Sequence, residues 1–253
     1  MAFELDFEDT FDGGALDTDR WLPHYLPQWS SRDRSAARYE LRDGCLRLQI
    51  TADQEPWCPA LDGEIRVSSL QTGCFAGPLG SRIGQHAFHP DAVVTEEQPE
   101  LRLYTPHYGR IEVRARALAD PRAMVALWMI GFEDDPARSG ELCVCEIFGS
   151  EVSAAEALVG VGTRKFADPT LEGDFEKVRV PIDATSFHVY AAEWTPGRVV
   201  FLVDGEPVKT VAEAPDYPMQ LMLGIYEFPD GDRRATDYPR EFVVDHVRGY
   251  RLT

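Results

Sequence analysis

Short segments in which apolar and polar residues alternate run through this 253-residue chain, and no long stretch repeats with the period of a helix. Successive side chains of a strand point to opposite faces, so the alternation predicts half-buried β-strands. Asp43-Gly44, Pro196-Gly197 and Asp204-Gly205 supply turn residues between such segments. The pattern predicts a single antiparallel β-sandwich domain over residues 1–253. The expected strands are Cys45–Thr51, Arg110–Leu118, Ala123–Ile130, Leu142–Phe148, Phe187–Trp194, Arg198–Val203, Met219–Tyr226 and Phe242–Leu252.

Long polar segments separate some of these strands, at Trp21–Tyr39, Cys74–Glu100 and Gly162–Glu176. Loops of this length inside a compact domain commonly form the walls of a functional site, so we expect ordered surface loops here. Only the alanine-rich stretch Glu151–Leu158 indicates a helical turn. We find no internal repeat, linker or low-complexity tract.

The alternation breaks within residues 141–148. Leu142 and Val144 fit one apolar face, but the next strongly apolar residue, Ile147, follows after three positions instead of two. One extra residue, a β-bulge at Val144–Cys145, restores the parity, and bulges are over-represented next to active sites. It also turns three side chains onto one surface, those of Glu141, Cys143 and Glu146. Two carboxyl groups a few ångströms apart on one face are what a retaining glycosidase needs.

The same reasoning assigns faces in two other strands. An apolar set running from Ile111 to Ala117 leaves charged residues on the opposite face. Between residues 124 and 130, Trp128 shares its face with the small Ala126. A small residue beside a large ring suits a concave surface on which sugar C–H faces stack. The alternative for Trp128 is a core position, since tryptophan is usually well buried.

The charge of the chain restricts its partners. Lys and Arg number 25 against 43 Asp and Glu, which gives a formal net charge of −18. Such a charge repels a phosphate backbone, and no basic cluster offsets it, so we expect no nucleic-acid partner. Neutral sugars are indifferent to this charge, which equally serves solubility.

The sequence also bears on the compartment. No apolar run approaches the roughly 18–20 residues needed to cross a membrane, so we expect no membrane association. The first residues lack the basic start, apolar stretch and cleavage site of a signal peptide. We therefore expect a cytoplasmic protein as written, and a secreted one if a leader was removed. An odd number of cysteines at irregular spacing favours a reducing compartment over a disulfide framework, and no second Cys/His pair completes a zinc site: Cys45, Cys58, Cys74, Cys143 and Cys145.

A series of short sequence blocks carries a resemblance that covers nearly the whole chain. In order, the blocks are Phe11–Gly13, Asp43–Leu46, Ser68–Thr72, Tyr108–Arg114, Ala126–Met129, Gly140–Glu146, Phe187–Pro196, Val203–Gly205 and Val244–Tyr250. Each block is weak alone, but taken in this order they resemble glycoside hydrolase family 16. The resemblance implies a jelly-roll sandwich of the concanavalin A-like lectin type, with a substrate cleft across the concave sheet.

The catalytic pattern of that family is Glu-x-Asp-x-x-Glu. The resemblance implies that Glu141 is the nucleophile and Glu146 the general acid/base, with Cys143 in place of the Asp. That Asp normally hydrogen-bonds the nucleophile. A thiol is a weak donor and a poor acceptor, and between two carboxylates we expect it to stay neutral. We expect Cys143 to hold Glu141 less firmly and to slow or redirect the activity.

Further site residues are expected, although no motif as specific as Glu-x-Asp-x-x-Glu identifies them. Trp194, Tyr108 and Trp29 are expected to line sugar subsites, and Arg38 to contact sugar hydroxyls, with core or rim packing as the alternative for each. The resemblance implies a structural calcium on the convex face, with Asp245 at one ligand position, although one carboxylate is a thin basis for a calcium site. We expect no cofactor to be required, and a monomer that binds a polysaccharide or oligosaccharide.

These observations leave more than one function open. The first is a retaining endo-β-glycosidase acting on β-1,3-linked glucan. The second is a non-catalytic carbohydrate-binding protein, which Cys143 favours, as does Gly160–Arg164 standing where a His-Gly element is common. The third is a cytoplasmic family member repurposed for another ligand or chemistry, since fold does not fix function.

Overall fold

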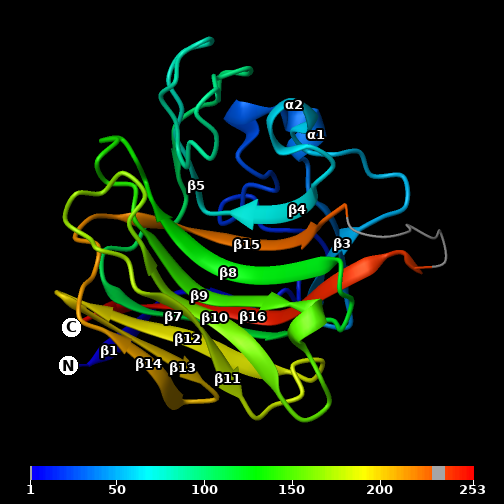
Figure 1. Ribbon diagram of the computed structural model, residues 1–253, viewed down its shortest axis with the longest axis vertical. Helices are drawn as coiled ribbons and strands as arrows, with labels where there is room; N and C mark the ends of the chain where they lie inside the picture. Colours follow the sequence, from blue (N-terminus) through cyan, green and yellow to red (C-terminus); the bar gives the residue numbers. More distant parts are fainter. Residues whose placement is uncertain (1, 230–236) are drawn as a thin grey trace.

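The computed structural model describes residues 2–229 and 237–253, whose strands form two large antiparallel sheets packed face to face (Figure 1). Sheet A has the strand order β14-β13-β12-β7-β16-β3-β2, and β1 pairs with β16 beside this path. Its members are β1 (Phe3–Asp9), β2 (Arg38–Arg42), β3 (Cys45–Ile50), β7 (Gly109–Arg116), β12 (His188–Thr195), β13 (Arg198–Val203), β14 (Glu206–Val211) and β16 (Arg240–Leu252).

Sheet B has the strand order β11-β10-β9-β8-β15-β4. Its members are β4 (Arg66–Gln71), β8 (Ala123–Gly131), β9 (Glu141–Phe148), β10 (Ala157–Arg164), β11 (Phe175–Val180) and β15 (Met219–Glu227). A short pair, β5 (Gly73–Cys74) and β6 (Leu101–Arg102), stands apart from both sheets. The antiparallel β-sandwich expected from the alternation is confirmed, and so is the jelly-roll form that the resemblance implies.

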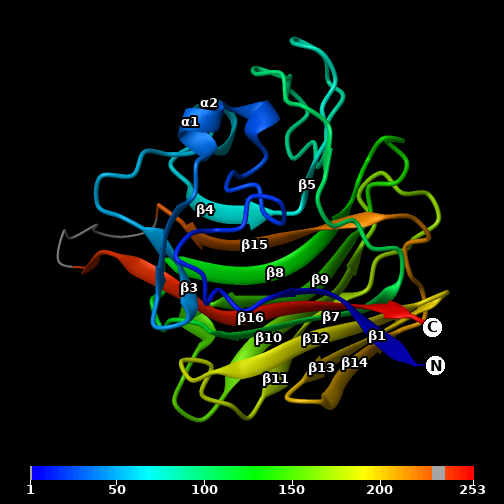
Figure 2. The same cartoon turned by 180° about the vertical axis from the view of Figure 1, so that it is seen from behind.

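The helices are short, and those within residues 27–62 lie with the long loops over one part of sheet B (Figure 1). They are the 3-10 helices η1 (Pro27–Trp29) and η2 (Gly149–Glu151) and the α-helices α1 (Arg32–Ser35) and α2 (Pro59–Asp62). Figures 1 and 2 show α1, α2 and the loop between β5 and β6 above β4 and β15. Among residues 2–229 and 237–253, no helix has the length and apolar character that crossing a membrane requires.

All eight strands expected from the sequence are present, with ends that differ by at most two residues. Two other expectations were wrong. The stretch Glu151–Leu158 is not a helical turn, because η2 ends at its start and β10 begins near its end. The segment Gly162–Glu176 is only partly a loop, since β10 and β11 enter it from either side. Gly160 and Gly162 weaken the strand signal of β10, because glycine has low strand propensity.

The main core lies between the sheets, and a second apolar cluster lies on the other face of sheet B. Alternation along β8 divides its residues between them: Val125 and Leu127 enter the main core, whereas Ala126 and Trp128 enter the second cluster. The apolar set from Ile111 to Ala117 also faces the main core, as its spacing predicted. Sheet B is therefore covered on one face by sheet A and partly on the other by the loops.

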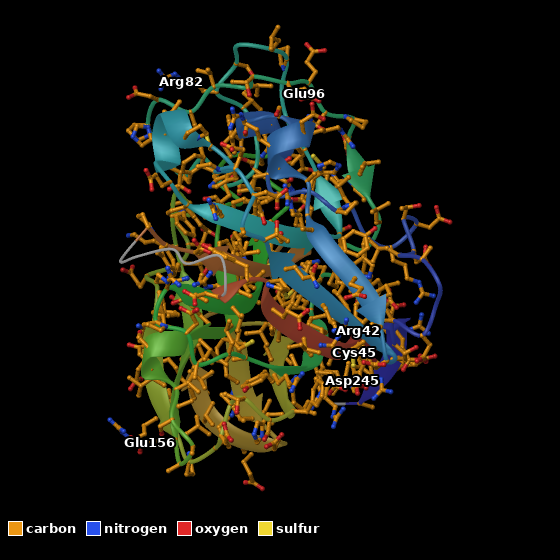
Figure 3. All side chains as sticks on the ribbon, turned by 90° about the vertical axis from the view of Figure 1, so that its right-hand side faces the viewer. Arg42, Cys45, Arg82, Glu96, Glu156 and Asp245 are labelled. Carbon is orange, nitrogen blue, oxygen red and sulfur yellow. The ribbon has the colours of Figure 1, made fainter. Side chains whose placement is uncertain are left out.

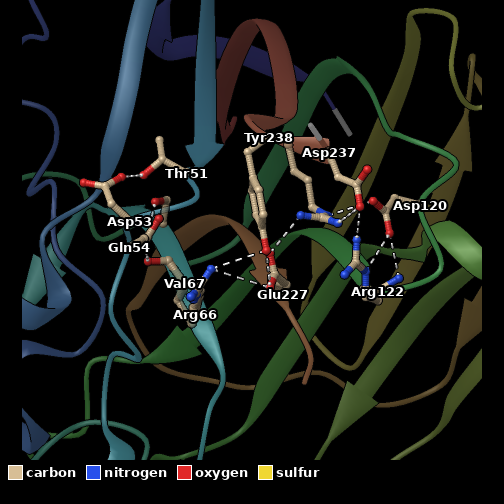
Figure 4. Close-up of polar contacts among 12 residues, drawn as sticks. Thr51, Asp53, Gln54, Arg66, Val67, Asp120, Arg122, Glu227, Asp237 and Tyr238 are labelled. Atoms are coloured by element: carbon tan, nitrogen blue, oxygen red, sulfur yellow. Dashed lines mark hydrogen bonds and ion pairs between the residues drawn. The ribbon is translucent and has the colours of Figure 1, made fainter. Parts of the chain in front are cut away.

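A buried ionic network fixes one end of β15 against the start of β16 (Figure 4). Arg240 Nη1 donates to Glu227 Oε2 at 3.1 Å, and its Nε donates to Asp120 Oδ2 at 2.7 Å. The Tyr238 hydroxyl donates to Glu227 Oε1 at 3.1 Å. The side chains of Arg240 and Glu227 are at most 1% exposed, so their pairing compensates charge that water cannot reach. The network holds the strand end that carries Tyr226, a residue of the site described next.

Candidate active site

The bulge predicted at Val144–Cys145 is present in β9. Trp128 of β8 pairs with Cys143 while its neighbour Leu127 pairs with Cys145, which leaves Val144 as the extra residue. The register between β9 and β10 shifts at the same place. The prediction from the broken alternation is therefore confirmed.

The bulge places two consecutive side chains on the same face of sheet B and so shifts the alternation of the residues that follow. Val144 and Cys145 are buried in the main core between the sheets. Glu141, Cys143 and Glu146 lie on the opposite face and line one cleft of about 380 Å³. The two carboxyl groups thus share a surface although they are five positions apart in a strand.

The cleft is built from sheet B and closed in by loops. Its floor includes Met124, Ala126 and Trp128 on β8 and Tyr226 on β15. Its walls are aromatic side chains from three loops, those of Tyr25, His86, Phe88 and Phe166. Apolar ring surface beside a few polar groups is typical of a small-molecule or sugar site.

One guanidinium contacts both carboxyl groups. Arg164, at the end of β10, donates from Nη1 to Glu141 Oε1 and from Nη2 to Glu146 Oε2, the latter at 3.2 Å. Its Cζ lies 3.8 Å from the centre of the Phe175 ring. The Glu141 side chain is 4% exposed, that of Glu146 16% and that of Arg164 31%, so solvent reaches Glu146 more readily than Glu141.

The environment perturbs the more buried carboxyl. Burial raises the pKa of Glu141 to about 7 from its ordinary value of 4.5, Arg164 opposes this rise and Glu146 adds to it. Burial disfavours the charged form, whereas an opposite charge nearby favours it. Glu141 therefore changes its charge near neutral pH, and Arg164 is the group that keeps it from staying protonated at higher pH.

Cys143 lies between the two carboxyl groups on the same face, but its thiol bonds elsewhere. Its Sγ donates to the carbonyl oxygen of Gly160 at 3.5 Å. Burial, followed by the charges of Glu141 and Glu146, raises the pKa of the thiol well above its ordinary value. Cys143 is therefore neutral at physiological pH, and it adds no third negative charge to the site.

Trp128 lies at the junction of the cleft and the second apolar cluster. It lines the cleft, yet it is only 7% exposed. Its Nε1 donates to the Tyr226 hydroxyl at 3.0 Å, and the His86 ring packs edge-on against it with ring centres 5.1 Å apart. Both readings made from the sequence therefore hold in part, since the ring is buried and also forms part of the cleft surface.

Three aromatic residues expected at subsites lie elsewhere. Trp194 is buried between the sheets and donates from Nε1 to the Pro215 carbonyl at 3.0 Å. Tyr108 packs on Trp194 and donates to Asp216 Oδ1 at 2.7 Å. Trp29 is 1% exposed in the second cluster. Core packing is the correct alternative for Trp194 and Trp29, because both rings are buried, and rim packing is correct for Tyr108, which is half-buried against Trp194.

Two polar residues also lie away from the cleft. Arg38 pairs with Asp53 at 2.5 Å and lines a separate hollow that shares no lining residue with the cleft. Asp245 is on sheet A, where it binds Arg114 and accepts from His246 Nδ1 at 2.7 Å. Figure 3 shows Asp245 beside Cys45 and far from Arg82 of the loop above sheet B. In the described part of the chain, no group of three or more His, Cys, Asp or Glu residues could hold a metal ion.

Sequence reasoning missed Arg164 and most of the cleft wall. The sequence places Arg164 only in a segment that replaces a family element and within the loop expected at Gly162–Glu176. A cue was available in Gly160, Gly162 and Arg164, whose two-residue spacing places them on one strand face. His86 and Phe166 carried no such signal, because they come from loops whose course depends on tertiary contacts.

A second hollow, of about 460 Å³, adjoins the cleft across His86 and Phe166. Glu133 lines it, is 6% exposed, and accepts a hydrogen bond from the His86 backbone N–H at 2.7 Å. Burial raises the pKa of Glu133 to about 8 from 4.5, whereas the His86 hydrogen bond lowers it. Glu133 thus holds the backbone of His86, the loop residue that lines both hollows.

The Glu133 environment predicts a pH-dependent stability. Its folded-state pKa lies above the unfolded one, so the folded state binds the proton more tightly and stability falls as pH rises from about 4.5 to about 8. Glu133→Gln keeps the acceptor for His86 but has no proton to lose. We expect its free energy of unfolding, relative to that of wild type, to rise by at least about 2 kcal/mol from pH 4.5 to pH 8.5, since one pKa unit corresponds to about 1.4 kcal/mol. Urea unfolding of both proteins at the two pH values measures this, and a difference independent of pH contradicts it.

Comparison with known proteins relates this geometry to a family. The model of "Glycosyl hydrolases family 16" matches residues 104–244, which include both carboxyl groups and Arg164. The chain is 29% identical over 166 residues to a beta-glucanase of Rhodothermus marinus, covering 57% of each protein. It is 23% identical to glucan endo-1,3-beta-glucosidase A1 of Niallia circulans, covering 99% of this chain and 38% of that protein.

A solved structure extends the similarity to nearly the whole chain. The GlcNAcα1-4Gal-releasing endo-β-galactosidase of Clostridium perfringens superposes with a TM-score of 0.85 and 30% identity. The match covers 98% of this chain and 62% of that one. The chain thus spans between about two fifths and three fifths of the length of these three proteins.

Proposed function

The chain belongs to glycosyl hydrolase family 16, and from this we propose that it is a retaining endo-β-glycosidase with Glu141 as nucleophile and Glu146 as general acid/base. The observation that supports this most strongly is the bulge in β9, which brings both carboxyl groups to one cleft. A retaining mechanism needs two carboxyl groups on the same sugar-binding surface, one ionised and one protonated.

In the first step, a Glu141 carboxylate oxygen attacks the anomeric carbon, and the bond from that carbon to the leaving sugar oxygen breaks. The proton of Glu146 passes to this leaving oxygen. The greater exposure of Glu146 suits its role, since the general base of the second step must reach water. Arg164 donates a hydrogen bond to Oε1 of Glu141. Among the described residues, no hydrogen bond engages Oε2.

In the second step, Glu146 takes a proton from water, and the water oxygen attacks the anomeric carbon. The ester bond to Glu141 breaks, and Glu141 leaves as a carboxylate. Two inversions at one carbon give a product with the configuration of the substrate. Cys143 takes no part in this scheme, because its thiol is neutral and bonds the Gly160 carbonyl.

For the substrate we propose β-1,3-linked glucan, and a β-galactoside as the second candidate. Two relatives by sequence are named as glucanases, one of them a glucan endo-1,3-beta-glucosidase. The second candidate is favoured by the endo-β-galactosidase, whose TM-score of 0.85 covers nearly the whole chain. The aromatic walls of the cleft suit the apolar C–H face of either sugar.

A panel of substrates tests the proposal. Wild type and Glu141→Gln are incubated with laminarin, mixed-linkage β-glucan and a β-galactan capped with GlcNAcα1-4Gal, and released reducing ends are measured. We expect internal cleavage of one class by wild type and none by the variant. Binding without release, unchanged in Glu141→Gln, contradicts the proposal and supports a carbohydrate-binding protein. Release by Cys143→Asp alone identifies a hydrolase whose activity has lapsed.

A further inference from the structure

We propose that Arg164 is the positioning residue of this site. It orients Glu141, as an acidic side chain at position 143 would do, and midway through the reaction it becomes the partner of the Glu146 carboxylate. This inference rests on the proposed function, because it concerns the same two carboxyl groups. It is carried by the contacts of one guanidinium, at the end of β10, with both of them.

The backbone register explains how Arg164 reaches both carboxyl groups. Arg164 pairs directly with Glu141 across β9 and β10, and Gly160 pairs with Glu146. Alternation places Gly160, Gly162 and Arg164 on the same face of β10. Because neither glycine has a side chain, the arginine can lie back along its own strand from the level of Glu141 to the level of Glu146.

Phe175 on β11 supports the guanidinium from its outer side. The ring lies 3.8 Å from Arg164 Cζ, and a Cβ atom at Gly160 would come within 2.7 Å of the same ring. Arg164 therefore approaches the carboxyl groups from the β10–β11 side. On the other side, Cys143 and Glu146 face Trp128 and Ala126 of β8, so the floor of the cleft stays open for a sugar.

The missing acidic residue creates the need for such a contact. The Cys143 thiol donates to the Gly160 carbonyl and not to Glu141, so it does not orient the nucleophile. Burial raises the pKa of Glu141, and a protonated carboxyl group cannot attack the anomeric carbon. Arg164 supplies both the orienting hydrogen bond and the opposite charge that favours the carboxylate.

Other titratable groups near Glu141 oppose ionisation or stay neutral. Glu146 and the Cys143 thiol share its strand, and Tyr226 on β15 and Tyr25 in a loop interact with it electrostatically. Burial raises the pKa of both tyrosines, so they are neutral in the working range. His86 is neutral as well, because burial lowers its pKa to about 4. Within the described part of the cleft lining, Arg164 is the one cation.

Charge then moves through the site in step with the reaction. Before attack, Glu141 is ionised and Glu146 carries the proton, so Arg164 acts mainly on Glu141. When the ester forms, Glu141 loses its charge and Glu146 has given its proton to the leaving oxygen. Arg164 then pairs with the new Glu146 carboxylate, the general base of the second step, through the existing Nη2 contact.

The test compares wild type, Arg164→Gln, Arg164→Lys and Arg179→Gln. Arg179→Gln is the matched control, because Arg179 on β11 is exposed and pairs with Glu156 away from the cleft. The pH dependence of kcat/KM is measured, together with a ¹³C carboxyl NMR titration of Glu141 in the free protein. In Arg164→Gln we expect kcat/KM to fall about 100-fold. We also expect the acidic limb of the kcat/KM profile and the titration midpoint of Glu141 to move up by at least about one pH unit. Arg164→Lys should restore part of both, and Arg179→Gln should match wild type.

Different failures have different meanings. If Arg164→Gln keeps the wild-type titration and pH profile while Glu141→Gln is inactive, the inference is overturned and the proposed function stands. If wild type hydrolyses no substrate, the proposed function is overturned, and so is the second-step role of Arg164. Its effect on Glu141 ionisation is still decided by the titration, which needs no turnover.

Discussion

Glu141→Gln is expected to lower kcat on the preferred β-glycan by a factor on the order of 10⁴ to 10⁶, as removal of a covalent nucleophile does in other hydrolases. The amide keeps the size of the side chain and an oxygen that can accept from Arg164, but it cannot form the glycosyl ester. Since Glu141 is 3% exposed, the change also removes a buried carboxyl whose burial raises its pKa, so we expect no loss of stability.

Initial rates and oligosaccharide binding by calorimetry measure this prediction. The matched control is Glu151→Gln, which makes the same chemical change beside Lys177 and away from the cleft, and should keep wild-type rates. Retention of more than about a tenth of the wild-type rate by Glu141→Gln would exclude Glu141 as the nucleophile. Equal loss in Glu151→Gln would instead indicate a general effect on the fold.

The second large effect is expected for Glu146→Ala, which removes the general acid/base. We expect kcat/KM on natural glycans to fall by about 10²- to 10⁴-fold, the usual contribution of such a group. Substrates with an activated aryl leaving group need no protonation, so their first step should slow far less. The glycosyl ester should then accumulate, because no base activates the water.

Azide distinguishes the two carboxyl roles. It is a small anion that needs no general base, and the partly exposed position of Glu146 leaves space for it in Glu146→Ala. We expect azide to restore turnover of an aryl glycoside and to give a β-glycosyl azide. Formation of an α-glycosyl azide by Glu146→Ala would contradict the assignment, since it implies direct displacement without an ester on Glu141.

The sequence allowed the catalytic face to be predicted because strand geometry is local. One misplaced apolar residue, Ile147, was enough to place the bulge beside Val144 and to bring Glu141 and Glu146 together. The faces of β7 and β8 followed from the same two-residue period. Such arguments need no knowledge of which strands are neighbours.

The parts that failed depend on neighbours. Trp194 and Trp29 are of a residue type that suits sugar subsites, but their burial depends on strands and loops far away in the chain. Arg164 reaches Glu141 only because β10 lies beside β9, and two glycines obscured that strand. The loop walls with His86 and Phe166 depend on tertiary contacts such as that of Glu133 with the His86 backbone. Alternation along one strand carries no information on these contacts.

The central claim is that Glu141 forms a covalent ester which Glu146 then helps to resolve. It is tested most directly by ¹H NMR of the anomeric protons during the first minutes of hydrolysis by the wild-type protein, before mutarotation mixes the products. Double displacement predicts that the β-anomer of the new reducing end appears first and the α-anomer grows only later. Appearance of the α-anomer first would show a single inversion and contradict a nucleophilic role for Glu141.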